Sequence, residues 1–177
     1  TRQEWRDWLI ENHESDGAIW LRTPHKASGL ERVPYDDVVE EALCFGWVDG
    51  LAKKYDDVSA VQRFTPRRKR TFLSELNRQR MFKMMRLGLM TDAGIAPVAD
   101  QLGSPDDPLV IPEDILVQIQ SDEEAWDNWQ KSPLIYRKIR IGYVMECRKS
   151  RPEDSQKRLN NLIKKTADNK MFGTMVE

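Results

Sequence analysis

The nine residues ALCFGWVDG, Ala42 to Gly50, decide how the N-terminal part of this chain folds. Before Gly46 the apolar residues recur with the spacing of one helix face, at Val38, Val39, Ala42, Leu43 and Phe45. After it, WVDGL is typical of a strand. Because glycine commonly ends a helix, the stretch predicts a helix-to-strand corner at which Cys44 and Phe45 pack inward.

The residues on either side of this corner predict a small sheet. WVDGLAKKYDDVSAVQRFTP, residues 47–66, has the pattern of a β-hairpin that turns around Asp56–Ser59 and closes at Pro66. The apolar run Ala18–Leu21 suits a buried strand. The first 13 residues place Trp5, Trp8 and Leu9 on one helical face.

The rest of the chain is predominantly helical in character. A helix is expected within 71–90, a short helix or turn follows, and four further helices are expected at 113–120, 122–131, 133–149 and 151–170. Ser121 with Glu124 and Ser150 with Glu153 fit the capping-box pattern. The fold class is therefore α+β, with a small, mostly antiparallel sheet covered by helices and then a C-terminal helical region.

Three parts of the chain follow from this pattern. Residues 1–102 are expected to form an α+β module, and residues 113–177 a helical region packed on it. Between them, residues 103–112 hold Pro105 and Pro108 and end on Pro112, so this segment is the linker candidate.

Composition limits the class of protein. The 177 residues are 40% hydrophobic with six tryptophans, enough for a real core, and no apolar run approaches the roughly 18–20 residues of a membrane span. The two cysteines lie far apart without a disulfide or metal framework, and no signal peptide is visible. We therefore expect a cytoplasmic protein.

Most chemical candidates are better explained structurally. Cys44 ends a helix among acidic residues, which disfavours a thiolate, and neither His13 nor His25 has a metal-ligand partner nearby. No glycine-rich phosphate loop occurs, so no cofactor is predicted. The paired carboxylates suit solvated surface; Asp16, Glu40 and Glu41 could gather a divalent cation, but their spacing does not demand one, and no metal site is predicted.

The strongest functional signal is a basic island. Residues 61–90 hold nine basic side chains and one acidic one. Within QRFTPRRKRTF, Phe64 and Phe72 accompany five cations, Arg63, Arg67, Arg68, Lys69 and Arg70. Arginine suits phosphate or carboxylate, and basic residues among aromatics also mark nucleic-acid binding. Neutralisation by the acidic stretch 91–130 is the simpler explanation of the charge.

Asp49 lies in a strand-like run, where aspartate is disfavoured and a carboxylate needs a partner. The nearest cations are Arg63 and Arg67, and the hairpin register decides which can meet it. A three-residue turn would place Asp49, Lys53, Arg63 and Arg67 on one face; a two- or four-residue turn would send Asp49 and Arg63 to opposite faces. Both an ion pair that locks the sheet and a ligand-facing site remain open.

The chain resembles the YdeI/OmpD-associated family of bacterial proteins, often labelled bacteriocin-protection proteins. The matching stretches are DGAIWL (16–21), YDDVVEEALCFGWVDG (35–50), QRFTPRRKR (62–70), SELNRQR (74–80), GLMTDAG (88–94) and SPLIYRKIRIGYVMECRKSRPEDSQKRLNNLI (132–163). The resemblance implies a bacterial protein linked to stress or toxin protection, with an N-terminal segment similar to YdhG and frataxin-like modules, and it implies no reaction. The proline-rich 103–112 region and AWDNWQ at 125–130 depart from the family pattern.

The positions that match family motifs are Trp20, Tyr35, Glu41, Trp47, Asp49, Gly50, Lys53, Arg63, Phe64, Thr65, Pro66, Arg67, Asn77 and Arg78. We expect a non-enzymatic module in which Lys53, Arg63, Thr65 and Arg67 hold a small anion while Trp47 and Asp49 shape the pocket, with Asn77 and Arg78 adjoining. A protein partner is a further expectation. The alternatives are a nucleic-acid contact through 63–86 and an enzyme using Asp49 with Arg63.

Overall fold

The computed structural model describes residues 1–15, 17–69 and 71–176, and its helices and one antiparallel sheet confirm the α+β class. The chain divides into two compact units, residues 1–73 with 81–103, and residues 74–80 with 104–177. Helix α3 (Glu75–Arg86) contributes residues to both. Two expectations stay predictions: residues 103–112 act as a linker, and the C-terminal region packs on the N-terminal module.

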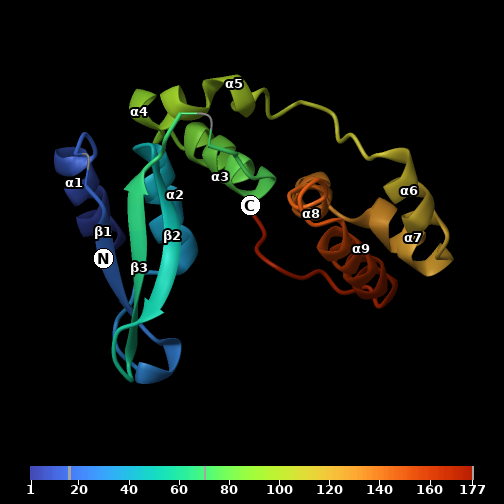
Figure 1. Ribbon diagram of the computed structural model, residues 1–177, viewed down its shortest axis with the longest axis horizontal. Coiled ribbons are helices and arrows are strands. Elements are labelled where there is room, and N and C mark those ends of the chain that lie inside the picture. Colours follow the sequence, from blue (N-terminus) through green and yellow to red (C-terminus); the bar gives the residue numbers. More distant parts are fainter. Residues whose placement is uncertain (16, 70, 177) are drawn as a thin grey trace. The chain divides into compact units, whose positions relative to one another are not determined.

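The first unit is built on a three-stranded sheet. Its elements are α1 (Arg2–Asn12), β1 (Ile19–Pro24), α2 (Tyr35–Cys44), β2 (Trp47–Lys54) and β3 (Ser59–Pro66), and the strand order is β1-β3-β2. Figure 1 shows the strands side by side with α1 and α2 packed along them. Both β1 and β2 are therefore edge strands.

Aromatic packing holds α1 against the sheet. Trp5 stacks on Trp8 with ring centroids 5.4 Å apart, Trp8 meets Trp47 edge-on at 5.6 Å, and Trp5 contacts Phe64. Burying each such side chain stabilises the fold by about 1.5–3 kcal/mol. The sequence prediction for the first helix is confirmed, because Trp5 and Leu9 are buried and Trp8 is half-buried.

The corner at Gly46 is confirmed. Gly46 adopts φ +73°, a conformation that side-chain-bearing residues rarely adopt, and a Cβ there would clash with the carbonyl oxygen of Ala93. Its own carbonyl accepts the Arg67 N–H (2.7 Å), which joins the start of β2 to the end of β3. The glycine thus ends α2 and lets the 91–95 segment approach closely.

The hairpin changes register halfway along. The Tyr55 N–H donates to the Ser59 carbonyl (3.1 Å) and closes a three-residue turn, so Lys53 pairs with Val61. A β-bulge then follows, in which Gly50 and Leu51 lie opposite one residue of β3, and Asp49 pairs with Phe64. Because paired residues share a face, the bulge reverses the face of every β2 residue that precedes it.

The two faces of the sheet are consequently distinct. One is covered by α1 and α2 and includes Ile19, Leu21 and Phe64. The other, which we call the open face, follows from the register and comprises Trp20, Arg22, Val48, Lys53, Val61, Arg63 and Thr65.

The remaining helices of the first unit pack on the opposite side of α2. They are the second half of α3, α4 (Asp92–Ile95), a 3-10 turn (Ala96–Val98) and α5 (Ala99–Leu102). A second buried cluster joins them to α2 through Val39, Leu43, Leu73, Met81, Phe82, Val98 and Leu102. The hydrophobic face predicted for the 35–45 helix therefore contacts two cores.

The second unit consists of helices around one core. They are α6 (Glu113–Gln120), α7 (Glu123–Lys131), α8 (Leu134–Met145) and α9 (Pro152–Ala167), with Ile115, Ile119, Trp129, Ile141, Val144, Leu159 and Leu162 buried between them. None of the helices in the described residues is long and apolar enough to cross a bilayer.

Both predicted capping boxes are wrong. Asp122, one residue after Ser121, caps α7 by accepting the Ala125 N–H (2.9 Å), because Ser121 belongs to the end of α6. Helix α9 begins with Pro152, whose ring needs no N–H partner, and no side chain caps it.

Candidate functional site

The open face carries two cations whose charge no carboxylate neutralises among the described residues. Arg63, in the central strand, is exposed and forms no ion pair there. The Nζ of Lys53 lies 5.2 Å from the ring centroid of Trp20. Trp20 is 43% exposed and stands opposite Arg63 in the pairing of β1 with β3. Thr65 lies on the same face, two residues beyond Arg63. The expectation that a three-residue turn would place Lys53 and Arg63 on one face agrees with this register.

Arg22, the third cation of this face, is already engaged. Its Nε donates to Ser59 Oγ (2.8 Å), its Nη2 pairs with Asp56 (2.8 Å), and its guanidinium lies 4.8 Å from the Tyr55 ring centroid. The pKa of Asp56 is lowered, first by the hydrogen bond from Ser59 and also by Arg22. Arg22 therefore fixes the turn, whereas Lys53 and Arg63 have no carboxylate partner among the described residues.

Asp49 and Arg63 lie on opposite faces of the sheet, so their pairing across the hairpin is wrong. The three-residue turn does form, but the bulge at Gly50–Leu51 reverses the orientation of Asp49. The carboxylate instead accepts a hydrogen bond from the Tyr35 hydroxyl (2.6 Å). Asp49 does not line the cavities of about 820 Å³ and about 210 Å³ that open in the first unit.

Two further predicted ligand contacts are buried. Trp47 is fully buried and its indole N–H donates to the His13 carbonyl (3.0 Å), so it belongs to the core and not to a pocket wall. Arg67 is 8% exposed and donates to the Phe72 carbonyl (3.2 Å). Burial lowers the pKa of Arg67, and the charge of Asp49 opposes that shift. Arg67 therefore holds the segment that follows β3 through the Phe72 carbonyl, and its charge lies within the electrostatic influence of Asp49.

Asn77 and Arg78 belong to the second unit, so the structure does not place them with the open face. Arg78 is bonded to Asp107, to Glu75 (3.3 Å) and to the Ser104 carbonyl (3.2 Å). Asn77 accepts a hydrogen bond from Arg80 (2.8 Å). Of the basic island, Arg70 lies outside the described residues.

The sequence analysis missed a buried ion cluster. Glu40 and Glu41 are 3% and 2% exposed, so the prediction that they form solvated surface is wrong. Glu41 accepts from Arg2 (2.6 Å) and Arg6 (2.6 Å), and Glu40 from Arg2 (3.2 Å) and Lys83 (2.9 Å). Two adjacent glutamates in a helix give no sequence signal that they are buried. The cations that pair with them come from distant segments, so the local sequence does not reveal the cluster.

This cluster also bears on metal and thiol chemistry. No group of three potential ligands suited to a metal ion occurs in the described residues, and Asp16 lies outside them. Burial and the nearby Glu41 charge raise the pKa of Cys44 to about 12. The thiol therefore stays protonated at neutral pH and is no nucleophile there.

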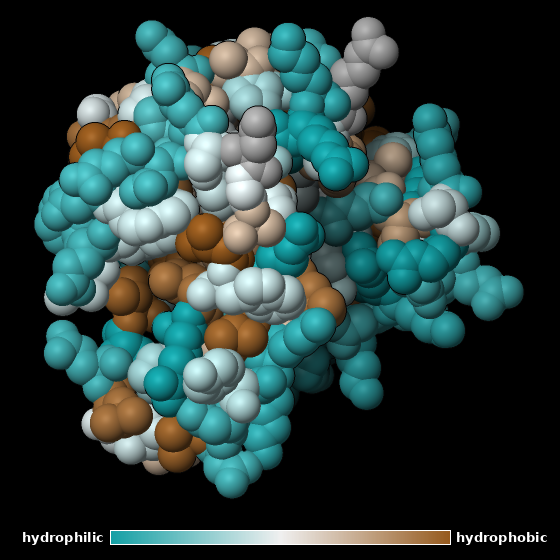
Figure 2. Space-filling view, turned by 60° about the vertical axis from the view of Figure 1, so that its left-hand side comes forward, coloured by the Kyte–Doolittle hydropathy of each residue, from teal (hydrophilic) through white to brown (hydrophobic). Residues whose placement is uncertain are grey.

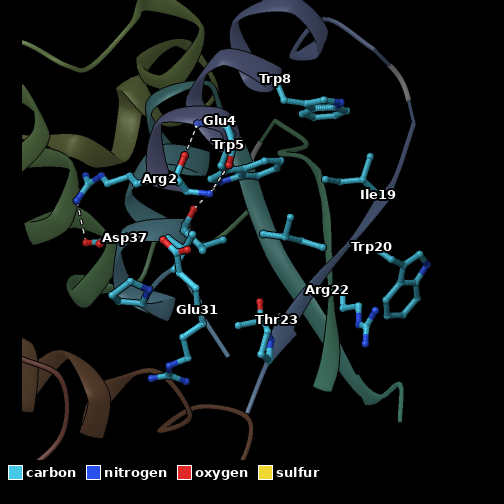
Figure 3. Close-up of a pocket in the computed structure, with 17 residues that line it drawn as sticks. Arg2, Glu4, Trp5, Trp8, Ile19, Trp20, Arg22, Thr23, Glu31 and Asp37 are labelled. Atoms are coloured by element: carbon cyan, nitrogen blue, oxygen red, sulfur yellow. Dashed lines mark hydrogen bonds and ion pairs between the residues drawn. The ribbon is translucent and has the colours of Figure 1, made fainter. Parts of the chain in front are cut away.

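A cavity of about 820 Å³ opens between α1, β1 and the segment before α2. Trp5 and Trp8 form its aromatic wall, and Figure 3 shows Ile19 and Thr23 directed into it while Trp20 and Arg22 point away. In Figure 2, apolar side chains gather in a hollow that hydrophilic side chains surround, on the side that carries α1 and β1. The sequence analysis did not predict this cavity, because its wall and edge come from separate elements.

Two family descriptions match the sequence. Residues 1–97, more than half of the chain, match the domain of unknown function DUF8412, and residues 108–169 match the family described as bacteriocin-protection, YdeI or OmpD-associated (OmdA). The resemblance predicted from the sequence is thereby confirmed over the C-terminal helices, whereas the motifs of residues 16–94 fall within the DUF8412 match. No curated protein and no solved structure matches. The chain therefore belongs to the DUF8412 family, and its C-terminal helices form an OmdA, or YdeI/OmpD-associated, domain.

Proposed function

We propose that the protein is a non-enzymatic binding module that holds a phosphate- or carboxylate-bearing ligand on the open face of its sheet. The observation that carries the proposal is Arg63, an exposed guanidinium in the central strand without a carboxylate partner in the described chain. A guanidinium presents paired N–H donors that match phosphate or carboxylate oxygens.

The neighbours of Arg63 suit the same ligand class. Lys53 adds a second cation, and Thr65 adds a hydroxyl on the same face, about 7 Å along the strand from Arg63. Trp20 offers a flat apolar surface beside them. An anion with a flat or apolar part would use all four groups.

The nucleic-acid alternative through 63–86 has less support. It needs a continuous run of free cations, but Arg78 and Lys83 are in ion pairs, and Arg67 and Arg80 are buried. Phosphate contacts by a nucleic acid would also make the affinity fall steeply as salt rises. A binding constant that changes little with salt excludes this alternative.

Replacing Arg63 with alanine should abolish stabilisation by anions without lowering the stability of the free protein, because the side chain is exposed and forms no ion pair in the described part. The measurement is thermal unfolding with pyrophosphate, adenosine monophosphate and citrate. A ligand at a hundredfold excess over its Kd stabilises the folded state by about 2.7 kcal/mol.

Arg68→Ala is the matched control, since Arg68 is also exposed but follows the sheet. It should retain the full ligand effect, and Lys53→Ala should retain part of it. Equal stabilisation of the parent and the Arg63→Ala variant, or no stabilisation of the parent by any of the three anions, contradicts the proposal.

A further inference from the structure

We infer that the free edge of β1 docks an extended, near-neutral peptide segment of a partner protein, which adds a strand to the sheet and inserts an apolar side chain into the cavity beside Trp5 and Trp8. The inference is independent of the anion site, because it uses the edge of the sheet and its covered side, whereas the anion site uses the open face.

The backbone of β1 offers unused hydrogen-bonding groups along this edge. The His25 N–H donates to the Val58 carbonyl (2.8 Å), and in an antiparallel ladder bonded and non-bonded pairs alternate. Ile19, Leu21 and Thr23 therefore bond β3, and the N–H and C=O groups of Trp20 and Arg22 point away from it. No other described residue bonds these groups.

The cavity runs along this same edge. All six residues of β1 line it, including Trp20 and Arg22, whose side chains point away (Figure 3). Side chains of the two faces point to opposite sides of the sheet. One cavity can therefore border residues of both faces only at the edge of the strand, where it meets their backbone atoms. Space for a further strand therefore lies directly beside the free N–H and C=O groups.

The covered side of the cavity can receive a side chain. Ile19, Leu21, Val33 and the Trp5–Trp8 pair form an apolar wall, and about 820 Å³ is within the usual range of ligand sites. In an added strand every second side chain faces this wall. The backbone would supply affinity, and the cavity would select an aromatic or large aliphatic residue.

The charges of the cavity favour a near-neutral occupant. Charged side chains that line it are Arg2, Arg32, Glu4, Glu31 and Asp37, whereas the Arg22 side chain points away (Figure 3). Arg2 is held by Asp37, Glu40 and Glu41, and Arg22 by Asp56, so neither is left to attract an anion. The lining has no excess of positive charge, because Arg2 is offset by Asp37 and Arg32 by the adjacent Glu31; it therefore matches a peptide backbone with apolar side chains and differs from the cationic open face.

The edge is also poorly protected. Natural edge strands are commonly blunted by proline, inward-facing charge or a covering loop. In β1 the proline, Pro24, stands at the last position, and the inward-facing residues Ile19, Leu21 and Thr23 carry no charge. The backbone groups of Trp20 and Arg22 are thus open to pairing.

The test compares two substitutions at one position. Arg22→Pro removes an N–H that points away from β3, which an edge strand tolerates, and Arg22→Ala removes the same side chain but keeps the N–H. The 177-residue parent chain is used to select binders from a displayed library of random octapeptides. Selected peptides should contain an aromatic or large aliphatic anchor, bind Arg22→Ala as they bind the parent, and bind Arg22→Pro about tenfold more weakly.

Amide hydrogen exchange of the parent gives a second readout that needs no variant. The Trp20 and Arg22 amides should exchange rapidly in the free protein and become protected with peptide, while Leu21 and Thr23 stay protected throughout. Three results overturn the inference: no enriched peptide, equal affinity for both variants, or unchanged exchange at Trp20 and Arg22. A dimer of the parent that Arg22→Pro abolishes would assign the edge to a second copy and also overturn it.

Discussion

A Glu41→Gln variant should unfold with a free energy about 3–5 kcal/mol lower than that of the parent, the largest loss expected from a single neutralised charge. Glu41 is almost fully buried and accepts from both Arg2 and Arg6. Glutamine keeps the shape but removes the charge that two guanidinium groups share, so Arg6 loses its carboxylate partner and Arg2 keeps only Asp37 and Glu40. Unfolding in urea is monitored by the hydrogen exchange of the amides of α1 and α2, so the measurement reports the effect in the first unit alone.

Asp37→Asn is the control, since Asp37 bonds the same Arg2 (2.8 Å) from a side chain that is 31% exposed. Its loss should stay below about 1 kcal/mol because solvent screens it. If both variants lose the same free energy, burial of Glu41 does not govern the cluster and this explanation is wrong.

A Gly46→Ala variant should lose about 2–5 kcal/mol, as the sum of left-handed backbone strain and overpacking against Ala93. The corner cannot relax freely, because the Gly46 carbonyl is bonded to the Arg67 N–H and the 91–95 segment is held by Thr91, whose hydroxyl donates to the Cys44 carbonyl (2.6 Å). The same exchange measurement reports the loss.

Gly88→Ala separates the two contributions. Gly88 follows α3, has φ +68°, and a Cβ there would meet open space. It should therefore cost only the strain, about 1–2 kcal/mol. A Gly46→Ala loss no greater than that of Gly88→Ala would show that close approach to Ala93 does not constrain the corner.

The sequence predicted those features of the fold that local chemistry controls. Gly46 ends a helix because few other residues adopt its conformation, and the hydrophobic period of the C-terminal region placed four helices within a few residues of their observed ends. The hairpin turn was predicted around Asp56–Ser59, where the structure has it, whereas its length, which sets the register of the strands, stayed open in the sequence. Each of these depends on neighbours within a few positions.

The errors arise where distant segments decide the outcome. Regular alternation along β2 would put Asp49 on the same face as Arg63. The β-bulge, in which two residues of β2 lie opposite one of β3, breaks this alternation and cannot be predicted from it. Glu40 and Glu41 look like surface carboxylates until Arg2, Arg6 and Lys83 arrive from other helices. Arg67 and Trp47 likewise lie in a functional-looking motif, and packing at the sheet end buries both.

The central claim is that Arg63 and Lys53 bind an anion on the open face beside Trp20. The most direct measurement is an NMR titration of the full chain with pyrophosphate, observing the side-chain N–H signals of arginine and tryptophan. We expect saturable shifts at the Arg63 Nε–H and the Trp20 indole N–H, with the buried Trp47 indole, bonded to the His13 carbonyl, unchanged. Shifts confined to other residues, or no saturable shift at Arg63, would contradict the claim.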